Sequence, residues 1–459
     1  MLLKNFTYPN PVSVYKSGSL ELFIEKVNVY IYHIIGYNIN IVYISRKVAA
    51  RMTYIKRDME KIVVELSEQY PVILITGPRQ VGKTTMLQKL MEGTDRTYVS
   101  LDDLNIRALA KSDPEMFFQL YKTPIFIDEV QYAPELFTYI KIMADKNQQS
   151  GEFWLTGSQI FKLMQGVQES LAGRVAVLNL SSLSQNEIYN SCSNVPFTTD
   201  FNVLRDRQKA IKPANTPEIF KRIFTGGMPA IVSGKYKDGN IFYMSYLSTY
   251  LERDVKELSG SIESLKFLKL ITAVACRTSQ IVNYADIARD ADINQVTAKS
   301  WMAILETLGI IFYLHPYSNN ILKRAIKTPK LYFYDTGLCT YLTKWSSPET
   351  LESGAMNGAM LENYVVSEIF KSYNNSAKTP FIYYYRDKDM KEIDLIIEAD
   401  GKLSPIEIKK TASPASQLTH VFKTLDRANI ERGNGAVLCM KEELMAFDSK
   451  NYIIPIRLI

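Results

Sequence analysis

The sequence contains few cysteines and few histidines. The four cysteines lie far apart and form no CxxC pair, which argues against a disulfide framework and against a cysteine zinc site. They are Cys192, Cys276, Cys339 and Cys439. The three histidines are also scattered, at His33, His315 and His420, which removes most zinc-hydrolase and histidine-base chemistry. The sequence therefore favours a reducing, cytoplasmic compartment.

Long apolar runs are absent as well. No stretch of about 18 apolar residues occurs, and the best candidate, residues 27–44, is interrupted by polar residues and alternates like a strand. No secretory signal pattern is present. We therefore expect no membrane partner. The 459 residues, 46% hydrophobic and 22% charged, are instead typical of about three globular domains.

The composition changes near Met52. Residues 1–51 are rich in Tyr, Ile and Asn and poor in acidic residues, whereas apolar residues recur at helical spacing over 55–66. We predict that residues 1–51 are an N-terminal extension without catalytic function. A polar stretch over 186–217 is a candidate connection between domains.

Apolar runs alternate with helical stretches between Tyr70 and about Leu180. The runs are PVILIT, TYVSL, PIFID, EFWLTG and VAVLNL, each bounded by turns or helices. Continuous apolar strands of this kind are buried on both faces, as in a parallel sheet that helices cover on both sides. The pattern predicts an α/β core.

A glycine-rich motif follows the first of these runs. Residues 77–85 read GPRQVGKTT, a full match to GxxxxGK[ST] between an apolar strand and a helix. In such a loop, backbone amides and the helix N-terminus bind phosphates, the lysine reaches the β- and γ-phosphates, and the hydroxyl binds Mg²⁺. Because no NKxD guanine-reading motif follows, the expected cofactors are ATP and Mg²⁺. The predicted nucleotide-binding residues are Gly77, Pro78, Arg79, Gln80, Val81, Gly82, Lys83, Thr84 and Thr85.

Two carboxylates end the apolar run over 124–128. Asp128 is the expected Mg²⁺ ligand beside Thr84, and Glu129 is expected to polarise the attacking water. A strand-end Asp-Glu pair in a plain turn is the alternative interpretation. The position of the pair after Lys83 favours the catalytic one, and Glu129 argues for ATP turnover.

Two further residues carry weaker predictions. Ser158 ends the strand FWLTGSQ, where it could contact the γ-phosphate or orient water, or serve only as a helix cap. Arg174, in SLAGR, could be an arginine finger that completes the site of a neighbouring subunit, which implies a homo-oligomer, or an ordinary surface arginine.

These motifs together resemble a large prokaryotic family of AAA-type ATPases. The resemblance rests on GPRQVGKTT, IFIDEVQ, LTGSQ and ESLAGR, and continues downstream in GGMPA (226–230), YLERDV (250–255), YDTGL (334–338) and LENYV (361–365). It covers about residues 52–459. It implies an ATP-binding protein with a C-terminal domain of unknown function.

Residues 283–314 predict a winged helix. Asn283 caps a helix to Arg289, a turn follows over 292–294, and a second helix runs over 295–308. The predicted buried face of that helix is Val296, Ala298, Met302, Leu305 and Leu308, and its exposed side is Gln295, Thr297, Lys299 and Ser300. Basic residues follow the wing, at Lys323, Arg324, Lys327 and Lys330. The module could bind DNA or pack domains together.

The C-terminal segment carries a second set of candidate residues. Asp394 lies on a predicted strand, and Glu407 and Lys409 share one face of the next strand. Two carboxylates and a lysine suit metal-dependent phosphodiester cleavage, with Asp394 and Glu407 binding Mg²⁺ and Lys409 activating water. The arrangement resembles the restriction-endonuclease-like PD-(D/E)xK core, with Glu362 as the helical acid and further metal ligand. Solvated strand charges are the alternative.

We therefore predict a P-loop NTPase (AAA-type) parallel-sheet core over 52–200, a mostly α linker and winged-helix domain over 201–345, and an α/β restriction-endonuclease-like domain over 346–459. The middle domain has 20 basic and 12 acidic residues, a net charge of +8 in a chain of +6, so any DNA should bind there. Three functions remain open. They are a DNA-dependent ATPase with or without cleavage, an ATP-gated protein-interaction or signalling switch, and an inactive nuclease relic that clamps nucleic acid.

Overall fold

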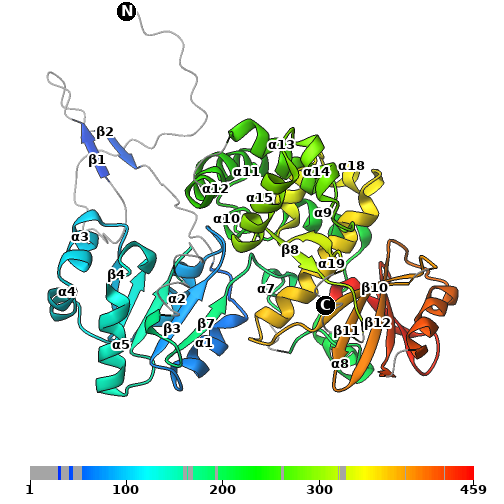
Figure 1. The fold of residues 1–459 in the computed structure, drawn as a ribbon, viewed down its shortest axis with the longest axis horizontal. Helices are drawn as coiled ribbons and strands as arrows, with labels where there is room; N and C mark the ends of the chain where they lie inside the picture. Colours follow the sequence, from blue (N-terminus) through cyan, green and yellow to red (C-terminus); the bar gives the residue numbers. More distant parts are fainter. Residues whose placement is uncertain are drawn as a thin grey trace, which may run out of the picture. The chain divides into compact units, whose positions relative to one another are not determined.

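The structure is a computed structural model (Figure 1). It describes the strands at 29–32 and 41–44 and residues 54–158, 163, 169–191, 195–259, 263–318, 320, 327–387, 389–427 and 430–459. Several residues singled out from the sequence lie outside this described part. They are His33, Gln159, Cys192, Lys323, Arg324 and most of the N-terminal extension.

The chain divides into two compact units, residues 1–53 and 54–459. In the first unit, β1 (Val29–Tyr32) and β2 (Ile41–Ile44) form an antiparallel pair with Tyr30 opposite Tyr43. The region that alternates like a strand in the sequence is thus two short strands.

The second unit begins with a parallel sheet of the order β4-β5-β6-β3-β7. Its strands are β3 (Val72–Thr76), β4 (Thr97–Ser100), β5 (Ile125–Asp128), β6 (Phe153–Thr156) and β7 (Val175–Asn179). Every one of the five predicted apolar runs forms one of these strands. The predicted α/β core with a parallel sheet is confirmed.

Helices pack on both faces of this sheet. Along β3, Ile73 and Ile75 belong to one hydrophobic cluster and Val72 and Leu74 to another, so alternate side chains enter two separate cores. The helices of this region are α1 (Met59–Ser67), α2 (Lys83–Met91), α3 (Leu104–Ser112), α4 (Pro114–Leu120), η1 (Val130–Tyr132) and α5 (Leu136–Asn147).

A largely helical region follows. Its elements are α7 (Gln185–Ile188), α8 (Phe201–Ala210), α9 (Thr216–Thr225), α10 (Pro229–Val232), α11 (Gly239–Tyr246), η2 (Leu247–Leu251), α12 (Glu252–Ser259), α13 (Ser264–Ala275), α14 (Tyr284–Asp290), α15 (Gln295–Thr307), β8 (Ile311–Leu314), β9 (Lys330–Phe333), α17 (Thr336–Leu342) and α18 (Pro348–Ser353). Asn283 caps α14 and Asn294 caps α15 through their side chains, and β8 pairs with β9 in antiparallel fashion. The two helices predicted over 283–308 and the strand after them are confirmed.

One prediction for this region is wrong. Val296 is 78% exposed, because the buried face of α15 begins only at Ala298, one turn into the helix, and includes Trp301. Apolar spacing alone does not show where along a helix its packing starts. The polar stretch over 186–217, a candidate connection between domains, contains α8 and overlaps α7. Helix α7 is buried, and its Asn186 side chain donates a hydrogen bond to the carbonyl oxygen of Ile459.

The C-terminal region forms a mixed sheet of the order β10-β11-β12-β14-β16-β15. β11 runs antiparallel to β10 and β12, whereas β12, β14 and β16 are parallel. Helix α19 packs against β12 (Figure 1). The elements are α19 (Asn357–Asn374), β10 (Ile382–Arg386), β11 (Glu392–Ala399), β12 (Lys402–Lys409), η3 (Ser416–Arg427), β13 (Glu431–Arg432), β14 (Gly435–Cys439), β15 (Met445–Ala446), β16 (Asn451–Pro455) and η4 (Ile456–Leu458).

Among the described residues, no helix combines the length and the apolar character that a membrane crossing requires.

Candidate functional site

The glycine-rich loop joins β3 to α2. Gly77, Gln80 and Gly82 have φ angles of 134°, 64° and 94°, a region that favours glycine. A Cβ on Gly77 would lie 2.2 Å from the carbonyl oxygen of Leu180, so glycine is needed there for space as well as for conformation. Gly82 immediately precedes α2, so the free amides of the first helical turn border the loop. The loop therefore has the shape of an anion-binding site.

Lys83 begins α2, and its side chain folds over the loop. Its ammonium donates hydrogen bonds to the carbonyl oxygens of Gly77, at 2.9 Å, and Pro78, at 2.8 Å. Burial lowers the pKa of Lys83 to about 8, although the nearby Glu129 carboxylate opposes this shift. A bound phosphate would favour the charged form of the lysine.

Three hydroxyl groups converge on Asp128 at the end of β5. Thr84 donates to its Oδ1 at 2.9 Å, Tyr98 donates to its Oδ2 at 3.3 Å, and Thr156 also donates to Oδ1. Burial raises the pKa of Asp128, an effect that the hydrogen bonds from Thr156 and Thr84 oppose. The Thr84 hydroxyl and the Asp128 carboxylate are therefore adjacent at the start of α2, and oxygen ligands of this kind suit Mg²⁺.

Glu129 follows Asp128 with a φ of 56°. Its Oε2 accepts hydrogen bonds from Gln131 Nε2 and from Ser158 Oγ, the latter at 3.2 Å. The structure thus brings Ser158 to the residue that is predicted to polarise water. The alternative role of Ser158 as a helix cap concerns residues outside the described part of the chain.

Arg174 lies apart from this group. Its guanidinium pairs with Asp145 through Nε and through Nη2, the latter at 2.9 Å, and also donates to the carbonyl oxygen of Ala172. The side chain is 31% exposed. Arg174 is therefore not part of the nucleotide site of its own chain. If it acts as an arginine finger, it acts on the nucleotide site of a neighbouring subunit.

Arg57 supports the loop through the carbonyl oxygen of Val81, a role that the sequence analysis missed. Its guanidinium donates to Glu187 Oε1 at 2.9 Å, to the Val81 carbonyl at 2.7 Å and to the Ser181 carbonyl at 2.7 Å. The residue is 3% exposed. A lone arginine before a helix is usually solvated, so no local pattern could have identified this role.

The helical region also contacts the loop directly. Arg79 forms an ion pair with Asp254 of α12 at 2.7 Å. A Cβ on Gly82 would lie 3.8 Å from Cγ of Pro229, the proline of the GGMPA motif. The YDTGL motif holds that segment in turn, because Asp335 Oδ2 accepts a hydrogen bond from the Gly227 amide at 2.7 Å. The downstream motifs GGMPA and YDTGL therefore position the helical region beside the P-loop.

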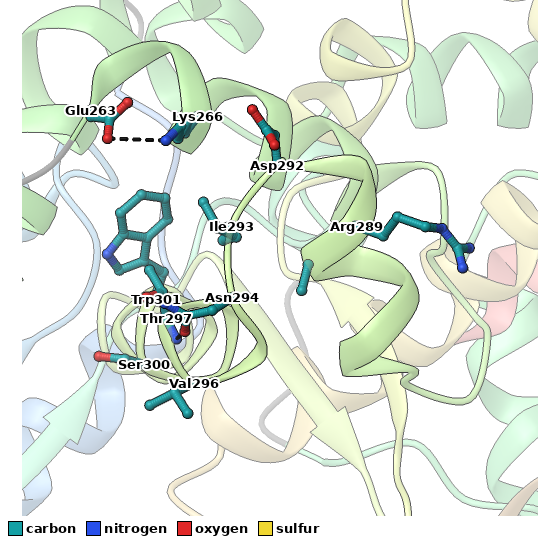
Figure 2. Close-up of a pocket in the computed structure, with 11 residues that line it drawn as sticks. Glu263, Lys266, Arg289, Asp292, Ile293, Asn294, Val296, Thr297, Ser300 and Trp301 are labelled. Atoms are coloured by element: carbon teal, nitrogen blue, oxygen red, sulfur yellow. Dashed lines mark hydrogen bonds and ion pairs between the residues drawn. The ribbon is translucent and has the colours of Figure 1, made fainter.

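The predicted DNA-reading face of α15 borders an open groove of about 920 Å³ (Figure 2). Figure 2 shows Trp301 between the Glu263–Lys266 ion pair and the first turn of α15, with Arg289 directed away. Gln295, Lys299 and Ser300 are exposed as predicted, and Thr297 is half-buried. The acidic residues Glu263 and Asp292 balance Lys266 and Arg289, so the groove carries no net charge of its own.

Asp394, Glu407 and Lys409 meet in the C-terminal sheet. Lys409 Nζ lies 3.1 Å from Asp394 Oδ2 and 2.8 Å from Glu407 Oε2. Asp394 Oδ2 also accepts a hydrogen bond from the Ile408 amide at 2.9 Å. Strands β11 and β12 are antiparallel with Leu395 opposite Ile406, and this register brings Asp394 of β11 next to Glu407 of β12.

Glu362 approaches the same group from α19, but with partners that the sequence did not indicate. Its Oε1 accepts hydrogen bonds from Lys330 Nζ at 3.0 Å and from Tyr332 OH at 2.8 Å. Lys330 also lies 2.6 Å from Glu392 Oε1. Lys330, one of the basic residues that follow the predicted wing, is therefore 3% exposed and held between two carboxylates. Lys327 of the same basic set is exposed.

Burial and mutual repulsion weaken the acidity of two of these carboxyls. Burial first and Asp394 second raise the pKa of Glu407 to about 8, and burial also raises the pKa of Glu362 to about 7. Glu407 Oε1 is buried without a hydrogen-bond partner. Within the described residues, no group of three or more His, Cys, Asp or Glu side chains is arranged to hold a metal ion.

Three family models match consecutive parts of the chain. Residues 69–189 match the model of the AAA domain, and residues 216–349 and 357–459 match two domains of unknown function, DUF8612 and DUF4143. The match to the AAA domain and the loop geometry agree, and residues 69–189 therefore form a P-loop ATPase core of the AAA type. The winged-helix and nuclease-like domains stay predictions.

Similar proteins are found in bacteria and archaea. The uncharacterized protein Rv2008c of Mycobacterium tuberculosis is 28% identical over 362 residues, which are 78% of this chain and 75% of that protein. The uncharacterized protein MJ1637 of Methanocaldococcus jannaschii is 23% identical and covers 80% of each chain. Among solved structures, the Walker-type ATPase PABY2304 of Pyrococcus abyssi is 17% identical, with a TM-score of 0.35 over 64% of this chain and 97% of its own. The RuvB Holliday junction branch migration motor of Thermotoga maritima is 14% identical, with a TM-score of 0.27 over 56% of this chain and 88% of its own.

Proposed function

We propose that the chain is a Mg²⁺-dependent ATPase that acts on DNA through its helical and C-terminal regions. The observation that carries the ATPase part is the contact between Thr84 and Asp128 beside Lys83, with Glu129 next to them. These are the metal-binding, phosphate-binding and water-polarising groups that phosphoryl transfer to water requires.

Each residue has one task in this mechanism. The loop amides and Lys83 bind the β- and γ-phosphates, and Thr84 and Asp128 would hold Mg²⁺, which neutralises phosphate charge when bound. Glu129 accepts the proton of the attacking water, and Gln131 and Ser158 hold its carboxylate in place. Arg174 would act only from a neighbouring subunit in a homo-oligomer.

For the C-terminal site, the proposed activity is metal-dependent phosphodiester cleavage that depends on the two carboxylates of Asp394 and Glu407, since the described residues form no metal-binding group of three or more. Asp394 and Glu407 would hold Mg²⁺, with Glu362 close by on α19, and Lys409 would orient the attacking water. The unpartnered, buried Oε1 of Glu407 fits this role, because a buried carboxylate oxygen without a donor is costly unless a cation binds it. The strand order also supports a restriction-endonuclease-like core, because β12, which bears Glu407, is antiparallel to β11 on one side and parallel to β14 on the other.

One observation favours the alternative of an ATP-gated switch with an inactive nuclease-like domain. The ammonium of Lys330 already neutralises part of the acidic group through Glu362 and Glu392. A lysine in this position could replace a metal ion, and the domain would then bind a protein or clamp nucleic acid without cutting it.

One experiment separates these functions. ATP hydrolysis and DNA integrity are measured with and without DNA for the wild type, Lys83→Ala and Asp394→Ala. The proposed function requires DNA-stimulated hydrolysis that Lys83→Ala abolishes and metal-dependent cleavage that Asp394→Ala abolishes. Slow, DNA-insensitive hydrolysis without cleavage would support the switch.

A further inference from the structure

Arg79 is the P-loop residue whose side chain reaches the helical region. Its Nε lies 2.7 Å from Oδ2 of Asp254, and its Nη2 donates to Oδ1 at 3.1 Å. The two side chains are 12% and 6% exposed. A planar guanidinium makes such two-point contacts with carboxylates and with phosphates in the same geometry. Asp254 belongs to α12, so this ion pair ties the nucleotide loop to α12.

The space around this ion pair is too small for a phosphate group. The cavity beside it has a volume of about 10 Å³, the room of about one water molecule. Its walls are Pro78, Arg79, Ser158, Tyr246, Asp254, Leu308 and Ile310. The turn before β8 closes it further, because a Cβ on Gly309 would lie 3.0 Å from Cγ of Pro78. Lys83 is only 6% exposed. This arrangement therefore holds the loop closed against α12 and the start of β8.

A bound nucleotide would act in opposite ways on the two charges of the Arg79–Asp254 ion pair. Burial lowers the pKa of Lys83, and the Asp254 carboxylate is close enough to oppose that shift. Burial opposes the rise in the pKa of Arg79, which comes from Asp254 first and from Glu129 after it. The triphosphate of ATP adds several negative charges beside Lys83, which repel the Asp254 carboxylate. The same charges attract the Arg79 guanidinium, because phosphate accepts the two-point contact as well as carboxylate does.

We propose that Arg79 exchanges partners when ATP binds. Its guanidinium breaks the ion pair with Asp254 and binds the terminal phosphate instead, and this frees α12 from the P-loop. Asp254 is then a positioning residue of the ATP site that is supplied from outside the core. The proposal rests on the proposed ATPase function and extends it to regulation. Because α12 packs against α15, the exchange reaches the helix that is predicted to read DNA.

The test compares MgATP with MgADP, since ADP lacks the terminal phosphate. Dissociation constants are measured for the full-length wild type, Asp254→Asn and Asp254→Glu. Asp290→Asn is the matched control, because it breaks the Arg277–Asp290 ion pair, which does not involve the P-loop. Asp254→Asn should tighten ATP binding relative to ADP about tenfold, equivalent to about 1.4 kcal/mol. Asp254→Glu and Asp290→Asn should keep the wild-type ratio.

The outcomes separate the exchange from the underlying function. An equal change for ATP and ADP in Asp254→Asn, or no change, would overturn the exchange while leaving the ATPase intact. A wild type that binds neither nucleotide would overturn both. Hydrogen exchange on the wild type is an independent measurement should Asp254→Asn fail to fold. The amides of α12 should exchange faster with ATP bound than with ADP, and identical exchange in the two states contradicts the proposal.

Discussion

At the scale of single residues, the nucleotide site separates binding from chemistry. In the proposed mechanism, Lys83, Thr84 and Asp128 bind the phosphates and the metal ion, whereas Glu129 is held by Gln131 and Ser158. Because Glu129 is expected to contact water and not phosphate, its charge should matter for turnover and not for binding.

Glu129→Gln should therefore keep ATP binding and reduce kcat about 100-fold or more, since an amide cannot accept the proton of water. Steady-state hydrolysis and equilibrium ATP binding measure the two effects. Glu135→Gln, an exposed glutamate nearby, is the control and should leave both unchanged. A kcat of wild-type size in Glu129→Gln contradicts the role of Glu129.

Arg57 shows how one buried charge can support a loop. It neutralises Glu187, whose side chain is fully buried, while it binds the carbonyl of Val81 in the P-loop. Arg57→Met should lower the free energy of unfolding by about 3–5 kcal/mol, because it leaves Glu187 buried and unpaired. Urea denaturation measures the loss. Lys61→Ala breaks the exposed Lys61–Glu65 pair and should cost less than about 1 kcal/mol. Equal losses in the two variants would show that Arg57 has no special role.

At the scale of elements, the P-loop depends on how closely β3 and β7 approach. Gly77→Ala should abolish ATP binding, because its Cβ would lie 2.2 Å from the Leu180 carbonyl oxygen and the φ of 134° excludes side chains. Gly93 has a φ of 81° but no heavy atom within 4 Å of its Cβ position. Gly93→Ala should therefore cost only about 1 kcal/mol of stability and keep ATP binding. Titration with a fluorescent ATP analogue checks both, and retained binding in Gly77→Ala would refute the steric argument.

Helix α19 joins two regions through consecutive residues of the LENYV motif. Glu362 faces Lys330 and Tyr332, and the next residue, Asn363, exchanges two hydrogen bonds with the backbone of Phe333, at 2.7 Å and 3.0 Å. Asn363 thereby fixes β9 against α19, which explains why Lys330 reaches a site in the C-terminal sheet.

At the scale of the whole molecule, the acidic site joins β9, α19, β11 and β12. The pKa values of Glu362 and Glu407 are raised to about 7 and about 8, so the folded chain retains protons that the unfolded chain releases at lower pH. The stability that these protons provide is lost as the pH rises toward 8. A divalent cation that replaces them should then stabilise the fold more strongly in alkaline than in acidic solution.

Mn²⁺ should therefore raise Tm more at about pH 8.5 than at about pH 6, because cation binding competes with protons on these carboxyls. Thermal unfolding without nucleotide at the two pH values measures the effect. Asp394→Asn should remove it, since Asp394 is an expected ligand. No shift in the wild type would favour the interpretation in which Lys330 replaces the metal ion. An equal shift at both pH values would show that the cation does not compete with the protons of Glu362 and Glu407.

The sequence by itself determined the elements and residues that local patterns encode. Apolar runs of five or six residues predicted the parallel sheet, and GxxxxGK[ST] predicted the conformation of the loop at Gly77 and Gly82. The alternation on β12 likewise placed Glu407 and Lys409 on one face. These patterns depend on neighbours a few residues away, which any part of the chain carries with it.

Only the tertiary structure decided which distant side chains meet. Arg57 and Glu187 are 130 residues apart and Arg79 and Asp254 are 175 apart, and neither pair has a spacing that a pattern could report. The sequence likewise presented Lys330 as one basic residue among several, but packing of β9 against α19 buries it between Glu362 and Glu392. Long-range contacts of this kind form because folding brings hydrophobic faces together. A charged residue on such a face must then find a partner, since an unpaired buried ion costs on the order of several kcal/mol.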